Sequence, residues 1–143
     1  MAEGTVIREV KSEHDLSEAA RVIRDSFRTA ADEFGFTEQN WPTHPAFITE
    51  ERVRVLVAEG LRLYALFLDK GQVGVVGIRR LDDQAYSLEK LGVLPEHRHQ
   101  GYGKKLVDFV CEAVKNESGR TVHIRVVEED TLLKQWYCDL GFV

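Results

Sequence analysis

The chain has 143 residues, of which 43% are hydrophobic and 30% charged, and 19 Lys and Arg against 24 Asp and Glu give a formal net charge of −5. This length and composition predict one globular domain over 1–143 and exclude disordered, collagen-like and disulfide-scaffold chains. The acidic balance argues against a nucleic-acid-binding protein, which normally shows a basic patch, and it weakly favours a cationic ligand. No apolar run approaches the ~18 residues of a membrane span, and the N-terminus has no apolar signal core, so we expect no membrane partner and a cytoplasmic location.

The N-terminal part is predicted to form one strand and two helices. Residues 5–10 have the pattern of a short strand. Ser12 and Asp15 resemble a capping box at the start of a helix over 15–28, whose apolar residues fall on one face. A second helix is predicted over 49–59.

The middle of the chain is predicted to be an antiparallel meander with short loops. Its strands cover 61–67, 73–81 and 85–93, and the first of them alternates with a period of two. The first loop is Asp69-Lys70-Gly71, in which Gly71 is available for the left-handed position of a hairpin turn.

The last third changes pattern. A polar segment, 95–103, precedes a helix with apolar residues at 106–114, a strand at 122–126 and a closing helix at 131–140. A strand, a crossover helix and a second strand imply a parallel pair. We therefore expect an α/β fold with a mixed sheet, in which an antiparallel meander is followed by a parallel β-α-β unit.

The most informative motif is Arg98-x-x-Gly101-x-Gly103, placed between a predicted strand and a predicted helix. Glycines at such a turn let backbone N–H groups approach a ligand without a Cβ in the way, and the positive end of the helix dipole suits a pyrophosphate. A tight strand-to-helix turn needs glycines anyway, so this motif alone leaves both interpretations open. Its spacing excludes the dinucleotide fingerprint and the Walker loop.

The chain resembles the GNAT superfamily of acyl-coenzyme A-dependent N-acetyltransferases. The Arg98-x-x-Gly101-x-Gly103 motif matches the coenzyme-binding motif of that family, and Trp-Tyr-Cys-Asp-Leu-Gly-Phe at 136–142 resembles the end of its last helix. The resemblance covers nearly the whole chain in element order. It implies a GNAT-like fold with a splayed coenzyme cleft, acetyl-CoA (acetyl-coenzyme A) as co-substrate and acetyl transfer to a primary amine by direct attack in a ternary complex. A small-molecule amine is favoured, and a protein amine or a non-catalytic acyl-CoA-binding or regulatory module on the same fold are the alternatives.

The same resemblance implies the coenzyme site. Backbone amides of the glycine turn would hold the pyrophosphate, and the edge of the preceding strand would pair with the pantetheine amides. The expected coenzyme-binding residues are Leu91, Gly92, Val93, Arg98, His99, Gln100, Gly101, Tyr102, Gly103 and Lys104. His97 and His99 have no evident third and fourth ligand partners for zinc, so we expect them to face phosphate and expect no metal.

Two residues are candidate catalysts. Tyr137 matches the tyrosine with which such enzymes protonate the departing thiolate, and a phenol with pKa near 10 can protonate a thiolate whose pKa is about 8.5; packing beside Phe142 is the alternative. Glu89 is the candidate base for the amine, because alternation predicts that it shares one face of its strand with Leu91 and Val93. Two residues span ~6.6 Å along a strand, which suits a carboxylate that acts through a water. An ordinary solvent-facing glutamate is the alternative there.

Other residues carry weaker expectations. Asp130 stands where the family often has an Asn that contacts the coenzyme, and we expect it to cap the last helix instead. Cys111 and Cys138 are expected to be small buried residues, because direct transfer needs no covalent nucleophile. Phe36 and Trp41 lie in the loop between the first two helices, where they belong either to the core or to an amine pocket.

The position of the last residue, Val143, carries one further expectation. The family usually continues past the Gly-Phe of its last helix into further strands, so a C-terminal strand is expected to be missing from this sequence. The strand at 122–126 would then present an unpaired edge. A homodimer is one way to cover that edge, and a truncated sequence is the other explanation.

Overall fold

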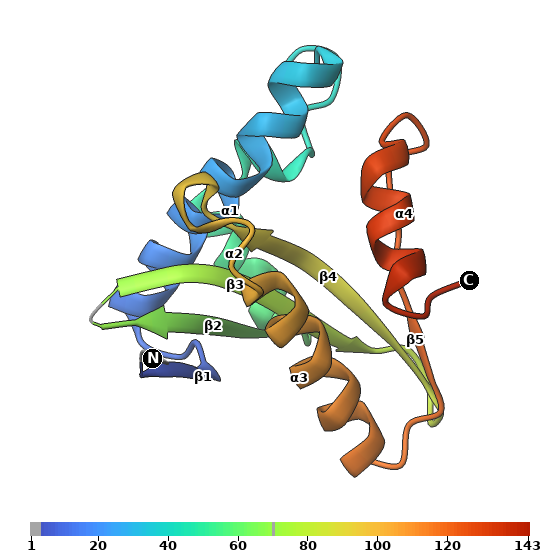
Figure 1. The fold of residues 1–143 in the computed structure, drawn as a ribbon. Coiled ribbons are helices and arrows are strands. Elements are labelled where there is room, and N and C mark those ends of the chain that lie inside the picture. The colour runs from blue at the N-terminus through green and yellow to red at the C-terminus, as the bar shows by residue number, and fades with distance from the viewer. Residues whose placement is uncertain (1–3, 70) are drawn as a thin grey trace.

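The computed structural model describes residues 4–69 and 71–143, which build a five-stranded sheet in the order β1-β2-β3-β4-β5 with helices on both faces (Figure 1). The strands are β1 (Thr5–Glu9), β2 (Arg62–Leu68), β3 (Gly71–Arg80), β4 (Ala85–Val93) and β5 (Thr121–His123). The helices are α1 (Glu13–Phe34), α2 (Glu50–Ala58), α3 (Tyr102–Asn116) and α4 (Thr131–Asp139), with short 3₁₀ turns η1 (Pro45–Phe47) and η2 (Pro95–His97). The first four strands are antiparallel and β5 is parallel to β4, which confirms the mixed sheet.

The sheet separates two apolar cores. Alternation along β3 sends Val75 toward α1 and α2 and Val76 toward α3, and both side chains are fully buried. Ile23 of α1 and Leu106 of α3 are buried in the cores on their respective faces. Each buried aliphatic side chain contributes about 1.5–3 kcal/mol relative to exposure. In the described part of the chain, no helix combines the length and apolar character that a membrane crossing requires.

The predicted helix caps are present. The Ser12 Oγ accepts the backbone N–H of Asp15 (3.1 Å) at the start of α1, and Asp130 Oδ1 accepts that of Leu133 (3.1 Å) at the start of α4. Helix α1 continues six residues beyond the predicted end at Arg28, to Phe34. It ends at Gly35 because that residue adopts the left-handed conformation (φ 73°), which glycine adopts without a Cβ penalty.

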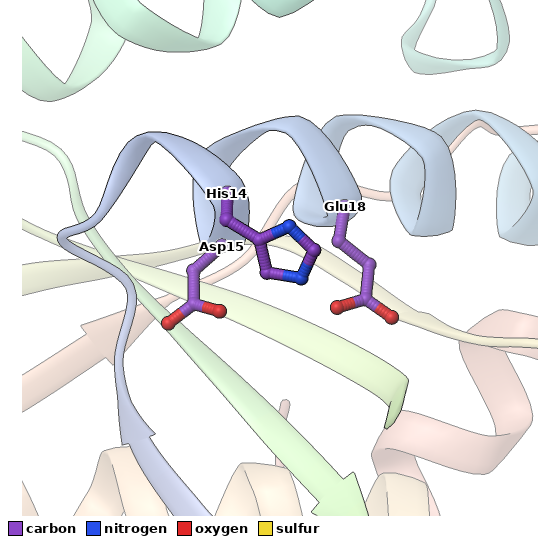
Figure 2. Close-up of side chains that lie close together, drawn as sticks. All are labelled: His14, Asp15 and Glu18. Carbon is purple, nitrogen blue, oxygen red and sulfur yellow. The ribbon is translucent and has the colours of Figure 1, made fainter. Parts of the chain in front are cut away.

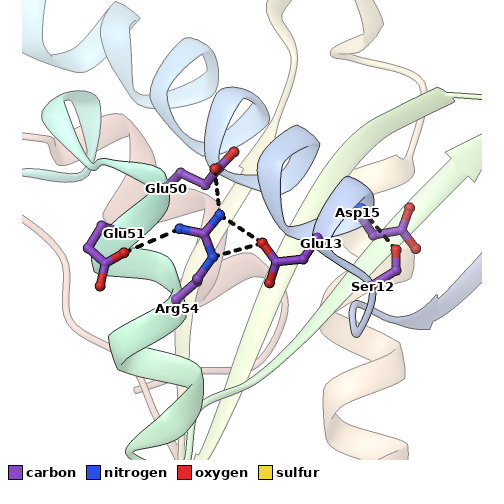
Figure 3. A network of polar contacts seen from close by, with 6 residues as sticks. All are labelled: Ser12, Glu13, Asp15, Glu50, Glu51 and Arg54. Carbon is purple, nitrogen blue, oxygen red and sulfur yellow. Dashed lines mark hydrogen bonds and ion pairs between the residues drawn. The ribbon is translucent and has the colours of Figure 1, made fainter.

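An arginine joins the first turns of the two helices on one face of the sheet. Arg54 of α2 lies 2.8 Å from the carboxylate of Glu13 on α1 and 2.6 Å from that of Glu50 on its own helix, and Glu51 is a third partner (Figure 3). The network is on the surface and solvent screens it. We therefore interpret the network as setting the orientation of α2 relative to α1, and not as a major contribution to the free energy of unfolding.

Two local predictions are wrong. Gly71 is the first residue of β3 and pairs with Leu68, so the left-handed position of this hairpin is taken by Asp69 (φ 56°); Lys70, also in the predicted loop, lies outside the described residues. Strand β5 covers Thr121–His123 and not 122–126, because it pairs with β4 only as far as Ser87 and then leaves the sheet.

A β-bulge in β4 overturns the predicted face of Glu89. Glu89 pairs with Gly77 of β3, yet Gly92 pairs with Val75, so three steps along β4 match two along β3. Lys90 absorbs the extra residue in a left-handed conformation (φ 58°). As a result Glu89 shares its face with Gly92, on the α1 side, and Val93 faces the opposite side, toward α3.

Candidate active site

The site opens where the two parallel strands separate. Strand β5 pairs with β4 only at Ala85–Ser87, and the two strands diverge toward the carboxyl end of β4 (Figure 1). Two cavities lie along that end of β4, one of about 500 Å³ and one of about 990 Å³. Both are lined by Phe27, Leu91 and Leu133, so they adjoin at the bulge.

The smaller cavity contains the glycine turn. Among the described residues, the backbone N–H groups from His99 to Lys104 have no hydrogen-bond partner. Gly101 is the N-cap of α3 in a left-handed conformation (φ 85°), and no side chain caps that helix. A Cβ at Gly103 would lie 3.2 Å from the ring of Trp136, so a glycine here lets α4 pack over the turn. Free amides at a helix N-terminus form an anion-binding site.

The structure brings most of the expected coenzyme residues into this cavity. Its lining includes Leu91, Gly92, Val93, Arg98, His99, Gly101, Tyr102, Gly103 and Lys104. Gln100 does not line it, although its N–H belongs to the unpaired run. Lys104 pairs with Asp108 one turn further along α3 (2.8 Å), which places its ammonium on the exposed side of the helix.

The guanidinium of Arg98 is engaged within the protein. Its Nε donates to the carbonyl of Val93 (3.0 Å), Nη2 to the carbonyl of Ser26 (2.6 Å) and Nη1 to the hydroxyl of Thr29 (3.2 Å). These bonds join the end of β4 to α1. Arg98 therefore holds the cavity wall together, a role that the motif did not predict because the α1 partners are distant in sequence.

Ser26 is a site residue that sequence reasoning missed. Its Oγ is buried and has no hydrogen-bond partner among the described residues, and it lines the smaller cavity beside Gly92. A Cβ at Gly92 would lie 2.6 Å from the Cβ of Ser26, so α1 approaches β4 closely here. A buried hydroxyl without a partner costs about 1–3 kcal/mol, which a ligand along β4 would relieve. The serine carries no local sequence signal.

The larger cavity brings Glu89 and Tyr137 together. The carboxylate of Glu89 accepts hydrogen bonds from Ser87 Oγ (2.7 Å) and Arg79 Nε (3.1 Å). Partial burial raises the pKa of Glu89, but these two bonds and the charge of Arg79 outweigh it and hold the pKa below its ordinary value. Tyr137 lines this cavity and not the smaller one; its side chain is buried and burial raises the pKa of the phenol. At neutral pH the glutamate is ionised and the tyrosine protonated.

An aromatic cluster surrounds His44, a second residue that sequence reasoning did not select. His44 is only 3% exposed, and the rings of Trp41 and Phe36 lie 4.9 and 5.0 Å from its centroid. Its Nδ1 accepts the N–H of Ala46 (3.1 Å), and burial, then the nearby charge of Lys90, lowers the pKa of the imidazole. The neutral ring therefore carries its proton on Nε2. Its place before Pro45, at the start of η1, is the signal that could have identified it as a cap.

A histidine and two carboxylates cluster in the first turns of α1, outside both cavities. The ligand atoms of His14, Asp15 and Glu18 lie within 4.8 Å of one another (Figure 2). Asp15 already pairs with Arg8 (2.7 Å), and Glu18 accepts the N–H of Gln72 (3.2 Å). These contacts account for the cluster without a cation.

The cysteines do not behave as expected. Cys111 on α3 and Cys138 on α4 are both exposed, so the prediction of burial is wrong. The neighbouring residues Val110 and Tyr137 are the ones that point into the core, so each cysteine lies on the outer face of its helix. The free amides of the turn and the acid and base candidates that line the larger cavity remain the chemically distinctive groups of the site.

The fold is that of an α/β protein in which two parallel strands separate beside a helix whose N-terminal amides are free in the described part of the chain. The family described as "Acetyltransferase (GNAT) domain" matches residues 52–143, so the chain belongs to that family and is an acyltransferase. This confirms the family and the enzyme class expected from the sequence.

Solved structures show the same fold. The PaiA N-acetyltransferase of Thermoplasma acidophilum, in complex with coenzyme A, has a TM-score of 0.78 at 20% identity over 100% of this chain and 91% of that one. A GNAT-family acetyltransferase of Staphylococcus aureus gives 0.75 at 20% identity, covering 98% and 85%. The aminoglycoside N-acetyltransferase AAC(6')-Iy, in complex with CoA, gives 0.69 at 20% identity, covering 100% and 90%. The GNAT-like fold predicted from the sequence is thereby confirmed.

The Arg98 contacts predict a stability effect. Replacing Arg98→Gln removes the donors to the carbonyls of Val93 and Ser26, and we expect the free energy of unfolding to fall by about 1–3 kcal/mol. Urea unfolding measures this. Arg28→Gln, at an exposed arginine of α1, is the control and should change the free energy by less than about 0.5 kcal/mol. Equal stability of the two variants would contradict the structural role of Arg98.

Proposed function

We propose that this protein transfers the acetyl group of acetyl-CoA to a small primary amine by direct attack in a ternary complex. One observation carries the proposal: a cavity with a run of unpaired backbone amides adjoins, at the β4 bulge, a cavity that holds Glu89 and Tyr137. A site for an anionic, phosphate-bearing co-substrate thus lies next to a site with an acid and a base.

The residues of the smaller cavity fit coenzyme A. The amides from His99 to Lys104 would hold the pyrophosphate, and the edge of β4 from Leu91 to Val93, which no strand covers among the described residues, would hold the pantetheine amides. The unpartnered Ser26 Oγ gives a further polar contact beside that edge. The coenzyme A complexes of the T. acidophilum enzyme and of AAC(6')-Iy, on the same fold, support this assignment. Bound acetyl-CoA supplies the activated thioester.

Glu89 is a better base for the amine than His44, which lines the same cavity. An amine arrives mostly protonated and must lose a proton before it attacks. Glu89 is ionised, and Ser87 and Arg79 hold its carboxylate in place. His44 is unsuited to the role, because its Nδ1 is occupied by the N–H of Ala46 and Nε2 already carries the proton.

Tyr137 is the proposed donor to the departing thiolate. Its raised pKa keeps the phenol protonated throughout the neutral range. Formation of a free phenolate is unfavourable at a buried site, so we expect the hydroxyl to keep its proton and to stabilise the developing negative charge with a hydrogen bond. The departing thiolate then takes its proton from solvent.

The proposal is tested by binding and turnover measured together. Acetyl-CoA at ~100 times its Kd should raise the free energy of unfolding by ~2.7 kcal/mol, and thiol should be released when amines are added. An acetyl thioester that lacks the nucleotide and pyrophosphate is the control and should stabilise the protein far less. Stabilisation without thiol release for any amine would contradict acetyl transfer and favour the non-catalytic binding module. No stabilisation at all would contradict both functions.

The role of Glu89 gives a second prediction. Glu89→Gln should lower kcat by about 10²–10⁴-fold at neutral pH and leave the Kd of acetyl-CoA unchanged. Because the pKa of Glu89 is below its ordinary value, the rise in the wild-type rate between pH 6 and pH 8 should follow deprotonation of the amine and not of Glu89. The difference in kcat between the wild type and Glu89→Gln should shrink as the pH approaches the pKa of the amine.

Steady-state rates between pH 6 and pH 10 measure this effect. Glu59→Gln, at an exposed glutamate at the end of α2, is the matched control and should keep the wild-type rate and pH profile. A Glu89→Gln variant that kept both would remove Glu89 from the mechanism.

A further inference from the structure

The larger cavity is positively charged, although the whole chain carries a net charge of −5. Arg79, Lys90 and Arg125 line it, and Glu89 is the one carboxylate among the described residues that do so. Arg79 and Glu89 neutralise each other in an ion pair of 3.1 Å. Neither Lys90 nor Arg125 forms an ion pair with any described residue, so two cations remain without a partner.

The bulge affects the position of Lys90 in the cavity lining. On a regular strand, successive side chains point to alternate faces of the sheet. Lys90 instead occupies the extra position of the bulge, with φ 58°. Its side chain is half-buried, and burial lowers the pKa of the ammonium. The charge of Glu89 acts in the opposite direction, and the charges of Arg79 and Arg52 act in the same direction as burial. A partly desolvated cation among other cations is stabilised by an anion that binds beside it.

One wall of the cavity is largely aromatic. Phe27, Trp41 and the neutral His44 line it, next to Pro45. Such a wall accommodates an apolar or compact substituent and offers no carboxylate to a second ammonium group. The charges and the wall together disfavour a polycationic acceptor.

We propose that the acceptor amine carries an acidic group, a carboxylate or a phosphate, which Lys90 and Arg125 bind while Glu89 takes the proton of the amine. This inference rests on the proposed function and names its substrate class. It reverses the weak preference for a cationic ligand that the net charge alone suggested, because the local charge of the cavity is opposite to that of the chain. It also sets this site apart from one that takes an aminoglycoside, the substrate class named for AAC(6')-Iy.

Matched amine pairs test the proposal. Thiol release from acetyl-CoA is compared for L-phenylalanine and phenethylamine, and for phosphoethanolamine and ethanolamine, with kanamycin as a polycation. L-phenylalaninamide separates charge from amine basicity, since its amine is less basic than that of phenylalanine and it has no acid group. We expect kcat/KM at least tenfold higher for the acid-bearing member of one or both pairs, a difference of 1.4 kcal/mol. The pair that responds distinguishes a carboxylate from a phosphate.

Two variants locate the effect. Lys90→Gln and Arg125→Gln should each raise KM for the acid-bearing amine about tenfold or more and change KM for its neutral partner much less. Calorimetric titration of the same amines into the protein without acetyl-CoA should show the same loss of affinity. Arg120→Gln, at an exposed arginine that lines neither cavity, is the control and should behave as wild type.

Failure of this inference differs from failure of the proposed function. If neutral or polycationic amines are acetylated as well as or better than the acid-bearing ones, acetyl transfer stands and the acidic-acceptor proposal is overturned. The proposal is also overturned if Lys90→Gln and Arg125→Gln raise KM equally for the acid-bearing amine and for its neutral partner. If no amine releases thiol, the proposed function fails. The calorimetric titration then tests the inference by itself: tighter binding of phenylalanine than of phenylalaninamide supports an acid-binding cavity, and equal or weaker binding overturns it.

Discussion

The separation of β5 from β4 is the constraint on which the site depends. Their pairing ends at Ser87 and His123, after which the outer edge of β4 has no strand partner among the described residues. The bulge at Lys90 lies within that uncovered stretch, and both cavities adjoin there. A sheet that continued its pairing would bury this edge and leave no room for a ligand between β4 and α4.

An uncovered strand needs support from elsewhere. Arg98 supplies it by joining the carbonyl of Val93 to that of Ser26 on α1. The absence of a Cβ at Gly92 lets α1 approach the strand from the same side. The glycine turn therefore contributes in two ways: its amides remain free for an anion, and the arginine that opens its motif holds the neighbouring strand in place.

Local signals predicted most of the element order and the two helix caps, Ser12 and Asp130, because caps and apolar periodicity act over a few residues. The bulge was not predictable in this way, since Lys90 gives no sign of a left-handed conformation and the alternation on either side of it looks regular. The partners of Arg98 were equally hidden, because Ser26 lies 72 positions away. The charge of the larger cavity emerges only when Lys90 and Arg125, from different elements, line one space.

We propose that the backbone amides of the glycine turn bind the pyrophosphate of the coenzyme. A ¹⁵N–¹H NMR titration with coenzyme A measures this at each amide. We expect the largest chemical-shift changes on the N–H groups from His99 to Lys104. These changes should saturate with one coenzyme per chain, and pantetheine, which lacks the pyrophosphate, should not reproduce them. Saturable binding of coenzyme A that leaves these amides unperturbed would contradict pyrophosphate binding at the glycine turn.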